Sequence, residues 1–343
     1  IVCLGSLLAA FAGGIGRILF IDPPNHRITI WRNLFFLGLC LGVVSICVHW
    51  GLGLFFDYNL ALSAVLYSAI WGTIVVAMLP LWENIFDVLS PLRLLELSHP
   101  SQPLLKRMQM EAPGTYNHVL MVATLAEAAA DKLHMNGLLV RAGAYYHDIG
   151  KLKNPQYFVE NQRPGINIHD SLDPLSSGQM LISHVPDGLA IAAQTNLPKA
   201  LRRFISEHHG TTVQRYFYEK AKAMGENVTE EQFRYPGPRP QSRETALVML
   251  ADSVEAAIKA RKEPFENDAQ MQDFINKVIK SKVDSGQLGD TDFTMREMAI
   301  ITEAFMDVFR ATYHSREVKD INQIIKENML RRENAGQKNE REG

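Results

Sequence analysis

Apolar residues are distributed very unevenly along this chain. Three nearly uncharged stretches cover residues 1–21, 34–56 and 60–82, whereas nearly all Asp, Glu, Lys and Arg follow Trp82. A helix of about 20 apolar residues crosses the hydrocarbon core of a bilayer, and a charged side chain near its centre is costly. We therefore expect transmembrane helices over residues 1–83 rather than a buried hairpin of a large soluble core.

The loops between these stretches predict an orientation. The first loop is basic, with Arg17, Arg27 and Arg32, whereas residues 57–59 carry no Lys or Arg. The positive-inside rule places the first loop in the cytoplasm, so the third span returns the chain to that side. The sequence predicts a multi-pass protein of the cell membrane, with the bilayer as a partner and the charged part in the cytoplasm. Since the chain starts at Ile1 inside an apolar run, we also expect a longer protein.

The charged part has a helical pattern. Residues 84–112 form a connector punctuated by prolines, and residues 113–328 follow as the predicted soluble domain. Apolar residues recur there at spacings of three and four, as on one buried face of a helix. They include Val119, Val122, Ala126, Ala129 and Leu133, and residues 246–260 and 295–313 repeat the pattern. Alternating patterns typical of strands are scarce, so we expect an all-α fold, followed by a charged, disordered tail over residues 329–343.

Charge and cysteine content exclude some classes of function. The chain has 35 Lys and Arg against 37 Asp and Glu, a net charge of −2, so no basic excess indicates a DNA or RNA polymer as a partner. The three cysteines lie in the apolar part without CxxC spacing. This pattern supports neither a zinc ribbon nor a disulfide framework.

Candidate metal ligands are concentrated in the helical part. His147 and Asp148 follow an apolar stretch, and a lone pair of this kind would be a weak signal. Five companions occur in other segments that are predicted to be helical: His118, His184, His208, His209 and Asp252. Imidazole nitrogens and carboxylate oxygens together suit Mn, Fe or Zn rather than Ca or Mg. Seven ligands exceed the need of one four-coordinate ion and would fit two metals that share a carboxylate. A helix cap at His184 and a solvated helix end at His208 and His209 remain alternatives.

The order of these residues resembles that of the HD phosphohydrolase superfamily, and more narrowly the seven-transmembrane-receptor HD family. The motifs that carry the resemblance lie between about Pro113 and Ala260. They are Gly114-Thr115-Tyr116-Asn117-His118, His147-Asp148-Ile149-Gly150-Lys151, Glu160-Asn161-Gln162, His169-Asp170, His208-His209-Gly210-Thr211, Tyr216-Phe217-Tyr218, Tyr235-Pro236-Gly237-Pro238 and Ala251-Asp252-Ser253-Val254-Glu255-Ala256. One segment departs from the family pattern, because Ile168 stands where proline is usual. The large extracellular domain of the family is not part of this sequence.

The resemblance implies a metal-dependent phosphodiesterase that opens cyclic di-AMP to linear 5′-pApA by attack of a bridging hydroxide. It implies that the seven residues bind two divalent transition-metal ions, Mn or Fe, with Asp148 as the bridge. Lys151, three residues beyond Asp148, can return to the same helical face and meet a phosphate oxygen. Asn117 and Tyr235 are the other candidate substrate contacts, although the segment around Tyr235 could also be a structural turn. We interpret His169-Asp170 as a loop that orients the site, and a homo-oligomer remains open.

Other functions remain as alternatives. Cyclic di-GMP hydrolases of this superfamily follow their His-His pair with Gly-Tyr-Pro, whereas Gly210-Thr211-Thr212-Val213 follows it here. Hydrolysis of guanosine tetraphosphate and 5′-nucleotidase action are further enzymatic alternatives. A receptor that binds a nucleotide without cleaving it belongs to a different class. Because degenerate sites usually lose a ligand and this set is complete, the sequence favours catalysis.

Overall fold

The computed structural model describes residues 85–312 except 164, 166 and 262, together with scattered positions between 62 and 83. The chain divides into two compact units, residues 1–97 and 98–343. The first unit contains α4 (Pro91–Leu97). The predicted spans over 1–21 and 34–56, most of the span over 60–82 and the predicted tail over 329–343 lie outside the described residues. Among the described residues, no helix has the length and apolar character to cross a membrane.

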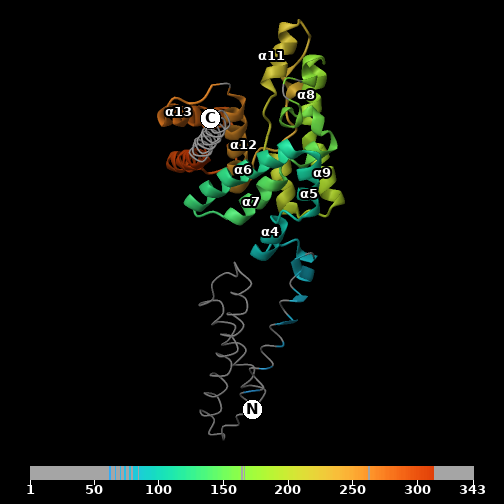
Figure 1. Cartoon of the computed structure of the whole chain (residues 1–343), viewed down its shortest axis with the longest axis vertical. Coiled ribbons are helices and arrows are strands. Elements are labelled where there is room, and N and C mark those ends of the chain that lie inside the picture. Colours follow the sequence, from blue (N-terminus) through green and yellow to red (C-terminus); the bar gives the residue numbers. More distant parts are fainter. Residues whose placement is uncertain are drawn as a thin grey trace, which may run out of the picture. The chain divides into compact units, whose positions relative to one another are not determined.

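Helices make up the regular secondary structure described in the second unit (Figure 1). Its α-helices are α5 (Pro103–Glu111), α6 (Pro113–Lys132), α7 (Gly137–Tyr146), α8 (Pro174–Ile182), α9 (His184–Gln194), α10 (Lys199–Glu207), α11 (Arg215–Ala223), α12 (Arg243–Ala260) and α13 (Asp268–Asp284). The 3₁₀ turns are η1 (Ile149–Lys153), η2 (Pro155–Tyr157), η3 (Val159–Asn161), η4 (Ile168–Asp170) and η5 (Glu230–Phe233), and a further helix covers residues 295–312. Within the described residues, extended pairing is limited to a single bridge between Val213 and Arg234. The predicted all-α fold is confirmed for this part of the chain.

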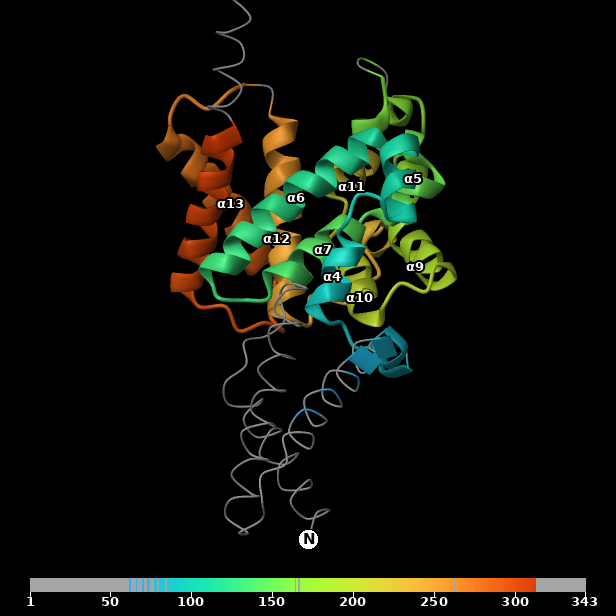
Figure 2. The ribbon, with the colours of Figure 1, turned by 60° about the horizontal axis from the view of Figure 1, so that its bottom comes forward.

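The core forms where α6 packs against α7 and α12 (Figure 2). The predicted apolar face of α6 is buried: Val119, Val122, Ala126 and Ala129 are each 0 % exposed. Leu133 is the exception, because α6 ends at Lys132 and Leu133 is its half-buried C-cap. Burial of such side chains is the main favourable term in folding. The core therefore fixes the helices that carry most of the candidate ligands.

Local signals set where the long helices begin. Pro113 occupies the first turn of α6, where a missing N–H costs nothing. The side chains of Asn136, Ser242 and Asn267 cap α7, α12 and α13 by accepting hydrogen bonds from backbone N–H groups. These caps satisfy donors that a helix N-terminus leaves unpaired. The cap at Ser242 sets the start of α12, on which Asp252 lies.

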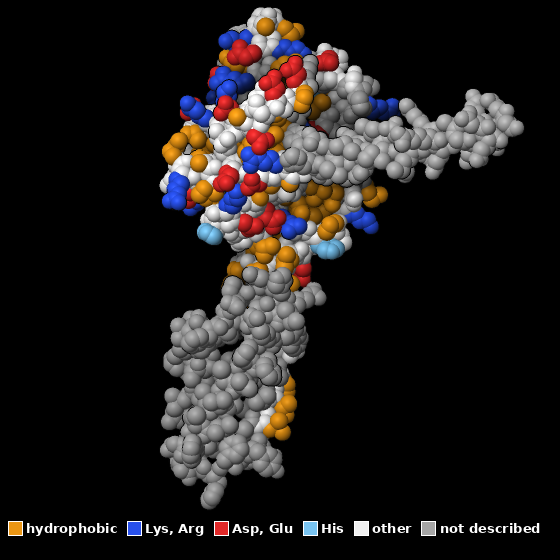
Figure 3. Space-filling view, turned by 60° about the vertical axis from the view of Figure 1, so that its left-hand side comes forward, with side chains coloured by type: hydrophobic (Ala, Val, Ile, Leu, Met, Phe, Trp, Pro, Cys, Tyr) orange, Lys and Arg blue, Asp and Glu red, His pale blue; other side chains and the backbone are white. Residues whose placement is uncertain are grey.

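A smaller apolar cluster lies beside α8, α11 and η5. Phe217, Ala221 and Phe233 are buried there, and partly buried neighbours complete the cluster. Those neighbours are Leu175, Leu181, Val213, Tyr218 and Val228. On the surface of this unit, acidic and basic side chains are interspersed over the face in Figure 3. That face presents no large area of one charge.

Candidate metal centre

Seven candidate ligands from five parts of the second unit meet in its interior. His118 lies in the second turn of α6, His147 and Asp148 directly follow α7, and Asp252 lies within α12. His184 begins α9, and His208 and His209 directly follow α10. All except His209 are at most 6 % exposed. The structure therefore brings together all seven residues that the sequence singled out.

His118, His147 and Asp252 form one group of potential ligands. Nε2 of His118 lies 3.0 Å from Oδ1 of Asp252, and Nε2 of His147 lies 3.9 Å from the same oxygen. Neighbouring helix elements of the core carry all three residues, so their side chains are held by packing. Two imidazole nitrogens and one carboxylate oxygen converge on one point.

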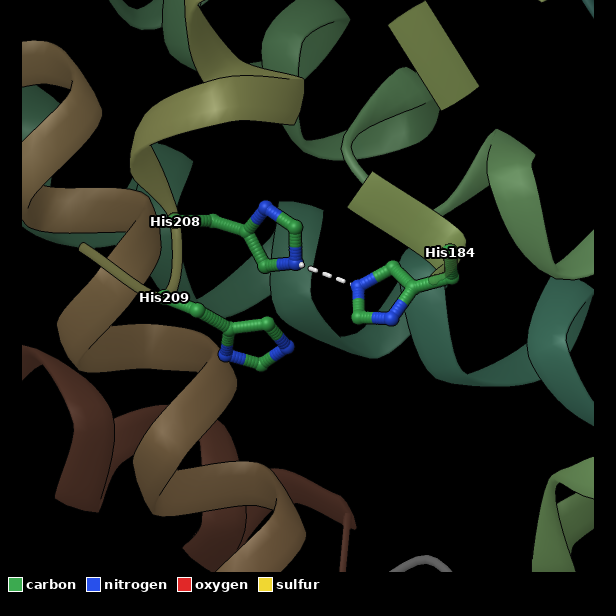
Figure 4. Close-up of side chains that lie close together, drawn as sticks. All are labelled: His184, His208 and His209. Atoms are coloured by element: carbon green, nitrogen blue, oxygen red, sulfur yellow. Dashed lines mark hydrogen bonds between the residues drawn. The ribbon is translucent and has the colours of Figure 1, made fainter. Parts of the chain in front are cut away.

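His184, His208 and His209 form a second group (Figure 4). Nε2 of His184 lies 3.1 Å from Nε2 of His208, and the ring of His209 lies beside both. The adjacent residues His208 and His209 both reach this point because α10 ends at Glu207, so the backbone is no longer constrained to a helix. The predicted alternative of a solvated helix end does not fit His208, which is 1 % exposed.

Asp148 lies between the two groups and offers one oxygen to each. Its Oδ2 lies 3.5 Å from Nε2 of His118 and 3.3 Å from Nε2 of His147. Its Oδ1 lies 3.4 Å from Nε2 of His184 and 3.6 Å from Nε2 of His208. Oδ1 of Asp148 and Nε2 of His147 are buried without a hydrogen-bond partner. Such orphaned atoms are rare in folded proteins, and a bound ion would satisfy both of them.

The tautomers of the histidines also favour cations at these points. Nδ1 of His147, His184 and His208 lies 2.7, 2.6 and 2.9 Å from the backbone carbonyl oxygens of Ala144, Leu181 and Ile205. A carbonyl only accepts, so each Nδ1 carries a proton, and a neutral ring in this tautomer presents its lone pair at Nε2. Two such lone pairs face each other at 3.1 Å between His184 and His208. A metal ion would turn this repulsion into coordination.

His118 has a different partner, which the sequence analysis missed. Its Nδ1 lies 2.7 Å from Oε2 of Glu255, which is 3 % exposed. The other Glu255 oxygen pairs with Lys259 at 2.7 Å. Glu255 is three residues beyond Asp252 and therefore lies on the same face of α12. That spacing, together with an acidic residue inside a buried helix, is the signal that could have identified it.

Burial and charge set the protonation of the group. Burial lowers the pKa of His208 to about 3 and also lowers the pKa of His184 and His209, so these rings are neutral, as metal ligands must be. Burial opposes ionisation of Asp148, but the charge of Lys151 and the contact with His147 outweigh it and hold the pKa of Asp148 well below its usual range. Three neutral histidines and the ionised Asp148 can therefore bind a cation without first losing a proton.

The pKa of His118 shifts in the opposite direction, upward, when no metal is bound. Burial disfavours its protonated form, but hydrogen bonds with Asp252 and Glu255 outweigh burial and raise the pKa of His118 to about 10. The same hydrogen bond from His118 overcomes the effect of burial on Asp252 and lowers the pKa of that carboxyl. A metal ion at this point therefore has to displace a proton from His118.

Glycines allow the segments around Asp148 to come close. A Cβ atom on Gly150 would lie 1.8 Å from the carbonyl oxygen of His184, so η1 and α9 can meet only at glycine. A Cβ atom on Gly114 would lie 1.8 Å from the carbonyl oxygen of Glu160. Since both glycines belong to the sequence motifs, the motifs include residues that permit backbone contact as well as candidate ligands.

Lys151 lies at the edge of the group. Its Nζ is 2.8 Å from Oδ2 of Asp148 and 2.8 Å from Oε1 of Glu160, and its side chain is 13 % exposed. Glu160 is in turn bound by the hydroxyl of Thr115 at 3.2 Å. Burial opposes the charge on Lys151, but the two carboxylates outweigh it and raise its pKa. The lysine is therefore charged and held beside Asp148.

The remaining candidates have different surroundings. Asn117 is exposed on α6, next to His118. Tyr235 is 6 % exposed, its ring lies 4.2 Å from that of His209 between centroids, and its hydroxyl accepts a hydrogen bond from Gln214 at 2.5 Å. His169 contacts the carbonyl oxygen of Tyr157 at 2.8 Å and belongs to neither ligand group. Tyr235 therefore supports the ring of His209, and His169 packs apart from the candidate ligands.

The chain is similar to known proteins over this part. Residues 115–257 match the family model described as HD domain. The chain is 40 % identical over 313 residues to the cyclic-di-AMP phosphodiesterase PgpH of Bacillus subtilis, covering 88 % of this chain and 43 % of that protein. It is 45 % identical over 241 residues to the protein of the same name from Listeria monocytogenes, covering 70 % and 33 %. The chain thus spans less than half the length of these curated relatives.

Solved structures agree with this similarity. The crystal structure of the L. monocytogenes phosphodiesterase PgpH HD domain is 45 % identical, with a TM-score of 0.59, and the match covers 62 % of this chain and 100 % of that one. The same domain in complex with cyclic-di-AMP gives a TM-score of 0.60 over 63 % of this chain and 100 % of that one. The whole length of a solved HD domain is therefore matched at high identity. The chain belongs to the HD-domain family, in the branch represented by PgpH.

Proposed function

We propose that the second unit hydrolyses one phosphodiester bond of cyclic di-AMP and releases linear 5′-pApA. The observation that carries this proposal is the position of Asp148, which offers one carboxylate oxygen to each of two buried groups of ligands. The names of the relatives and the bound cyclic-di-AMP in the solved Listeria domain support the substrate.

The donor atoms suit two divalent transition-metal ions, with Mn or Fe as the proposed identities. When bound, such ions would generate a nucleophile from water at neutral pH and offset charge on the phosphodiester. Residues of the chain hold the ligand atoms in position for these ions. Backbone carbonyls fix Nε2 of three histidines toward the centre, and Glu255 does the same for His118. Asp148 holds the two groups at a fixed separation.

Lys151 is the proposed contact to the phosphate that reacts. Its ammonium is charged and already lies 2.8 Å from the carboxylate that faces both groups. Glu160 limits its motion, so the lysine is positioned before substrate binds. Asn117 is exposed beside His118 and stays a proposed substrate contact. Tyr235 also stays one, although its 6 % exposure limits contact to a small part of the ring.

We also propose that the first unit spans the cell membrane and places the second unit in the cytoplasm. The described positions of the third apolar stretch are helical and expose apolar side chains by 38–56 %. They include Leu62, Leu66, Ile70, Ile74, Met78 and Leu81. Lipid is the favourable solvent for apolar side chains that a helix exposes in this way. An impermeant thiol reagent should label Asn59→Cys but not Asn25→Cys in intact cells, and the reverse pattern would rule out this orientation.

The substrate is tested by turnover. Residues 98–343, purified with Mn or Fe, should convert cyclic di-AMP to 5′-pApA, with products identified by mass spectrometry. The same preparation should be supplied with cyclic di-GMP and guanosine tetraphosphate. Faster turnover of either compound would reject cyclic di-AMP as the preferred substrate. Binding of cyclic di-AMP without any product would indicate a non-catalytic receptor.

A further inference from the structure

His209 is the candidate ligand whose ring is least firmly held. Nδ1 of each of the other four histidines contacts a backbone carbonyl or Glu255. Among the described residues, no hydrogen bond reaches the ring of His209, and its Nδ1 lies 3.8 Å from Oδ2 of Asp252, too far for one. The ring packs against Tyr235 and His208 at 4.2 and 4.0 Å between centroids. Ring packing does not fix where a nitrogen points, so the position of His209 depends on its backbone.

The backbone around His209 makes a tight turn. Gly210 has a φ of +54°, in the left-handed region that glycine adopts at little cost. Its N–H donates to the carbonyl oxygen of Glu207 at 2.9 Å, and the carbonyl oxygen of His209 accepts from the hydroxyl of Thr212 at 2.8 Å. These bonds join residues of the turn to one another. A contact with another element is needed to hold the turn in place against the core.

Gln287 supplies such a contact from a distant part of the chain. Its side chain is 3 % exposed, and its Oε1 accepts from the backbone N–H of Thr211 at 2.9 Å. Its Nε2 donates to the hydroxyl of Thr211 at 3.2 Å. A Cβ atom on Gly210 would lie 2.4 Å from Oε1 of Gln287, so the amide fills the space beside the turn. On its other side, the carbonyl oxygen of Thr211 accepts from Nη1 of Arg234 at 2.8 Å. Both backbone polar groups of Thr211 are therefore held.

Gln287 is itself fixed beyond the end of α13. Its N–H donates to the carbonyl oxygen of Lys282 at 3.1 Å, and Nη1 of Arg239 donates to the carbonyl oxygen of Gly286 at 2.9 Å. The helix α13 packs against α12, which carries Asp252 (Figure 2). All of α13 lies beyond the residues that match the HD-domain model. A segment outside that match thus holds the turn that carries a candidate ligand.

We propose that Gln287 is a positioning residue for the second group of ligands, because its bonds to Thr211 fix His209 relative to His184 and His208. This inference rests on the proposed function, since it concerns one of the two proposed metal ions. Residues that orient a metal ligand typically contribute about ten- to a hundredfold to metal affinity. Loss of Gln287 should weaken only the ion of this group, because other contacts hold His118 and His147.

The test is a chelator titration of the Mn-loaded full chain, purified in detergent. Gln287→Met removes both hydrogen bonds at nearly constant side-chain volume. The matched control is Gln270→Met, because Gln270 accepts the backbone N–H of Glu266 at 2.9 Å near the other end of α13. Gln287→Met should bind one of its two ions about ten- to a hundredfold more weakly and the other as the wild type does. Gln270→Met should bind both like the wild type.

A double variant shows whether Gln287 acts through His209. His209→Gln removes the ligand and identifies the ion of the second group as the one that is weakened. Adding Gln287→Met to this variant should weaken that ion no further, because effects that act through one residue do not add. A further loss of the full size overturns the positioning role and assigns Gln287 to general stability. If Gln287→Met does not fold, Gln287→Asn replaces it, since an amide that is one methylene shorter no longer reaches Thr211.

The remaining outcomes separate this inference from the proposed function. Release of both ions as in the wild type by Gln287→Met overturns the role of Gln287, and so does equal weakening of both ions or the same loss in Gln270→Met. A wild-type chain that holds no ion in the second group also overturns it. A wild-type chain that holds two ions but leaves cyclic di-AMP intact rejects the proposed function, and the titration still decides the role of Gln287.

Discussion

Gly150→Ala should separate the two halves of the metal centre. The added Cβ would lie 1.8 Å from the carbonyl oxygen of His184 and 2.5 Å from the backbone nitrogen of Gly188. Real Cβ atoms essentially never approach closer than 3.0 Å, so η1 and α9 must move apart by at least 3.0 − 1.8 = 1.2 Å. Both neighbours are backbone atoms, so no side-chain rotation can relieve the contact.

The displacement acts directly on the candidate ligands. Asp148 precedes η1 and His184 begins α9, so their present separation of 3.4 Å between Oδ1 and Nε2 increases. Metal–ligand distances tolerate only about 0.2 Å, so Asp148 can no longer serve both groups. We expect the variant to lose at least half of its metal. Turnover should fall about a hundredfold or more, as a misplacement of about 1 Å can produce.

Metal content per chain, turnover and thermal unfolding should be measured on the same preparation. Gly178→Ala is a matched control, because its Cβ would lie 2.8 Å from the ring of Phe233 in the small apolar cluster, away from the ligands. Overpacking costs about 1–3 kcal/mol, so both variants should be less stable. Only Gly150→Ala should lose metal. Wild-type metal content and turnover in Gly150→Ala would refute this account of the glycine.

Three further predictions concern residues around the centre. Glu255→Gln should weaken metal affinity about ten- to a hundredfold in a chelator competition, because it no longer supplies a charged acceptor to Nδ1 of His118. In the metal-free domain, the pKa of His118 is raised from 6.5 to about 10, so its stabilising effect is complete below pH 6.5 and is lost as the pH rises through 10. Thermal unfolding of that domain should show this loss, and His118→Gln should remove it. Lys151→Ala should lower turnover about ten- to a hundredfold, with metal content retained.

Each of these predictions has a result that contradicts it. Equal chelator competition for Glu255→Gln and the wild type would mean that Glu255 does not influence His118. A His118→Gln variant with the same pH dependence as the wild type would assign the transition to another group. Loss of metal in Lys151→Ala would make that lysine a structural partner of Asp148, and unchanged turnover would exclude its contact with the reacting phosphate.

Helical periodicity predicted the core of this domain well because each helix buries a single face, so spacing along the chain determines which side chains are buried. The apolar face of α6 follows from Val119, Val122, Ala126 and Ala129, which all pack against one side of the core. Leu133 departs from the pattern because the helix ends one residue earlier, and helix ends depend on caps rather than on periodicity. The seven candidate ligands could be singled out because His147 and Asp148 have five His and Asp companions, in an order that resembles the HD superfamily.

The remaining features depend on contacts that the sequence does not encode locally. Glu255 carries only the weak signal of its spacing from Asp252. Gln287 and Thr211 are 76 residues apart, and nothing in either segment indicates that they meet. The close approach of Gly150 and His184 also requires the tertiary packing of η1 on α9. The close backbone approaches that these glycines permit, and distant hydrogen bonds of this kind, emerge only from the three-dimensional structure.

The central claim is that Asp148 joins two metal-binding groups, and metal analysis tests it most directly. The purified wild-type domain should contain close to two transition-metal ions per chain by mass spectrometry of the digested protein. Asp148→Ala should lose most of that metal together with nearly all turnover, because both groups depend on its carboxylate. Full metal content in folded Asp148→Ala would contradict the claim.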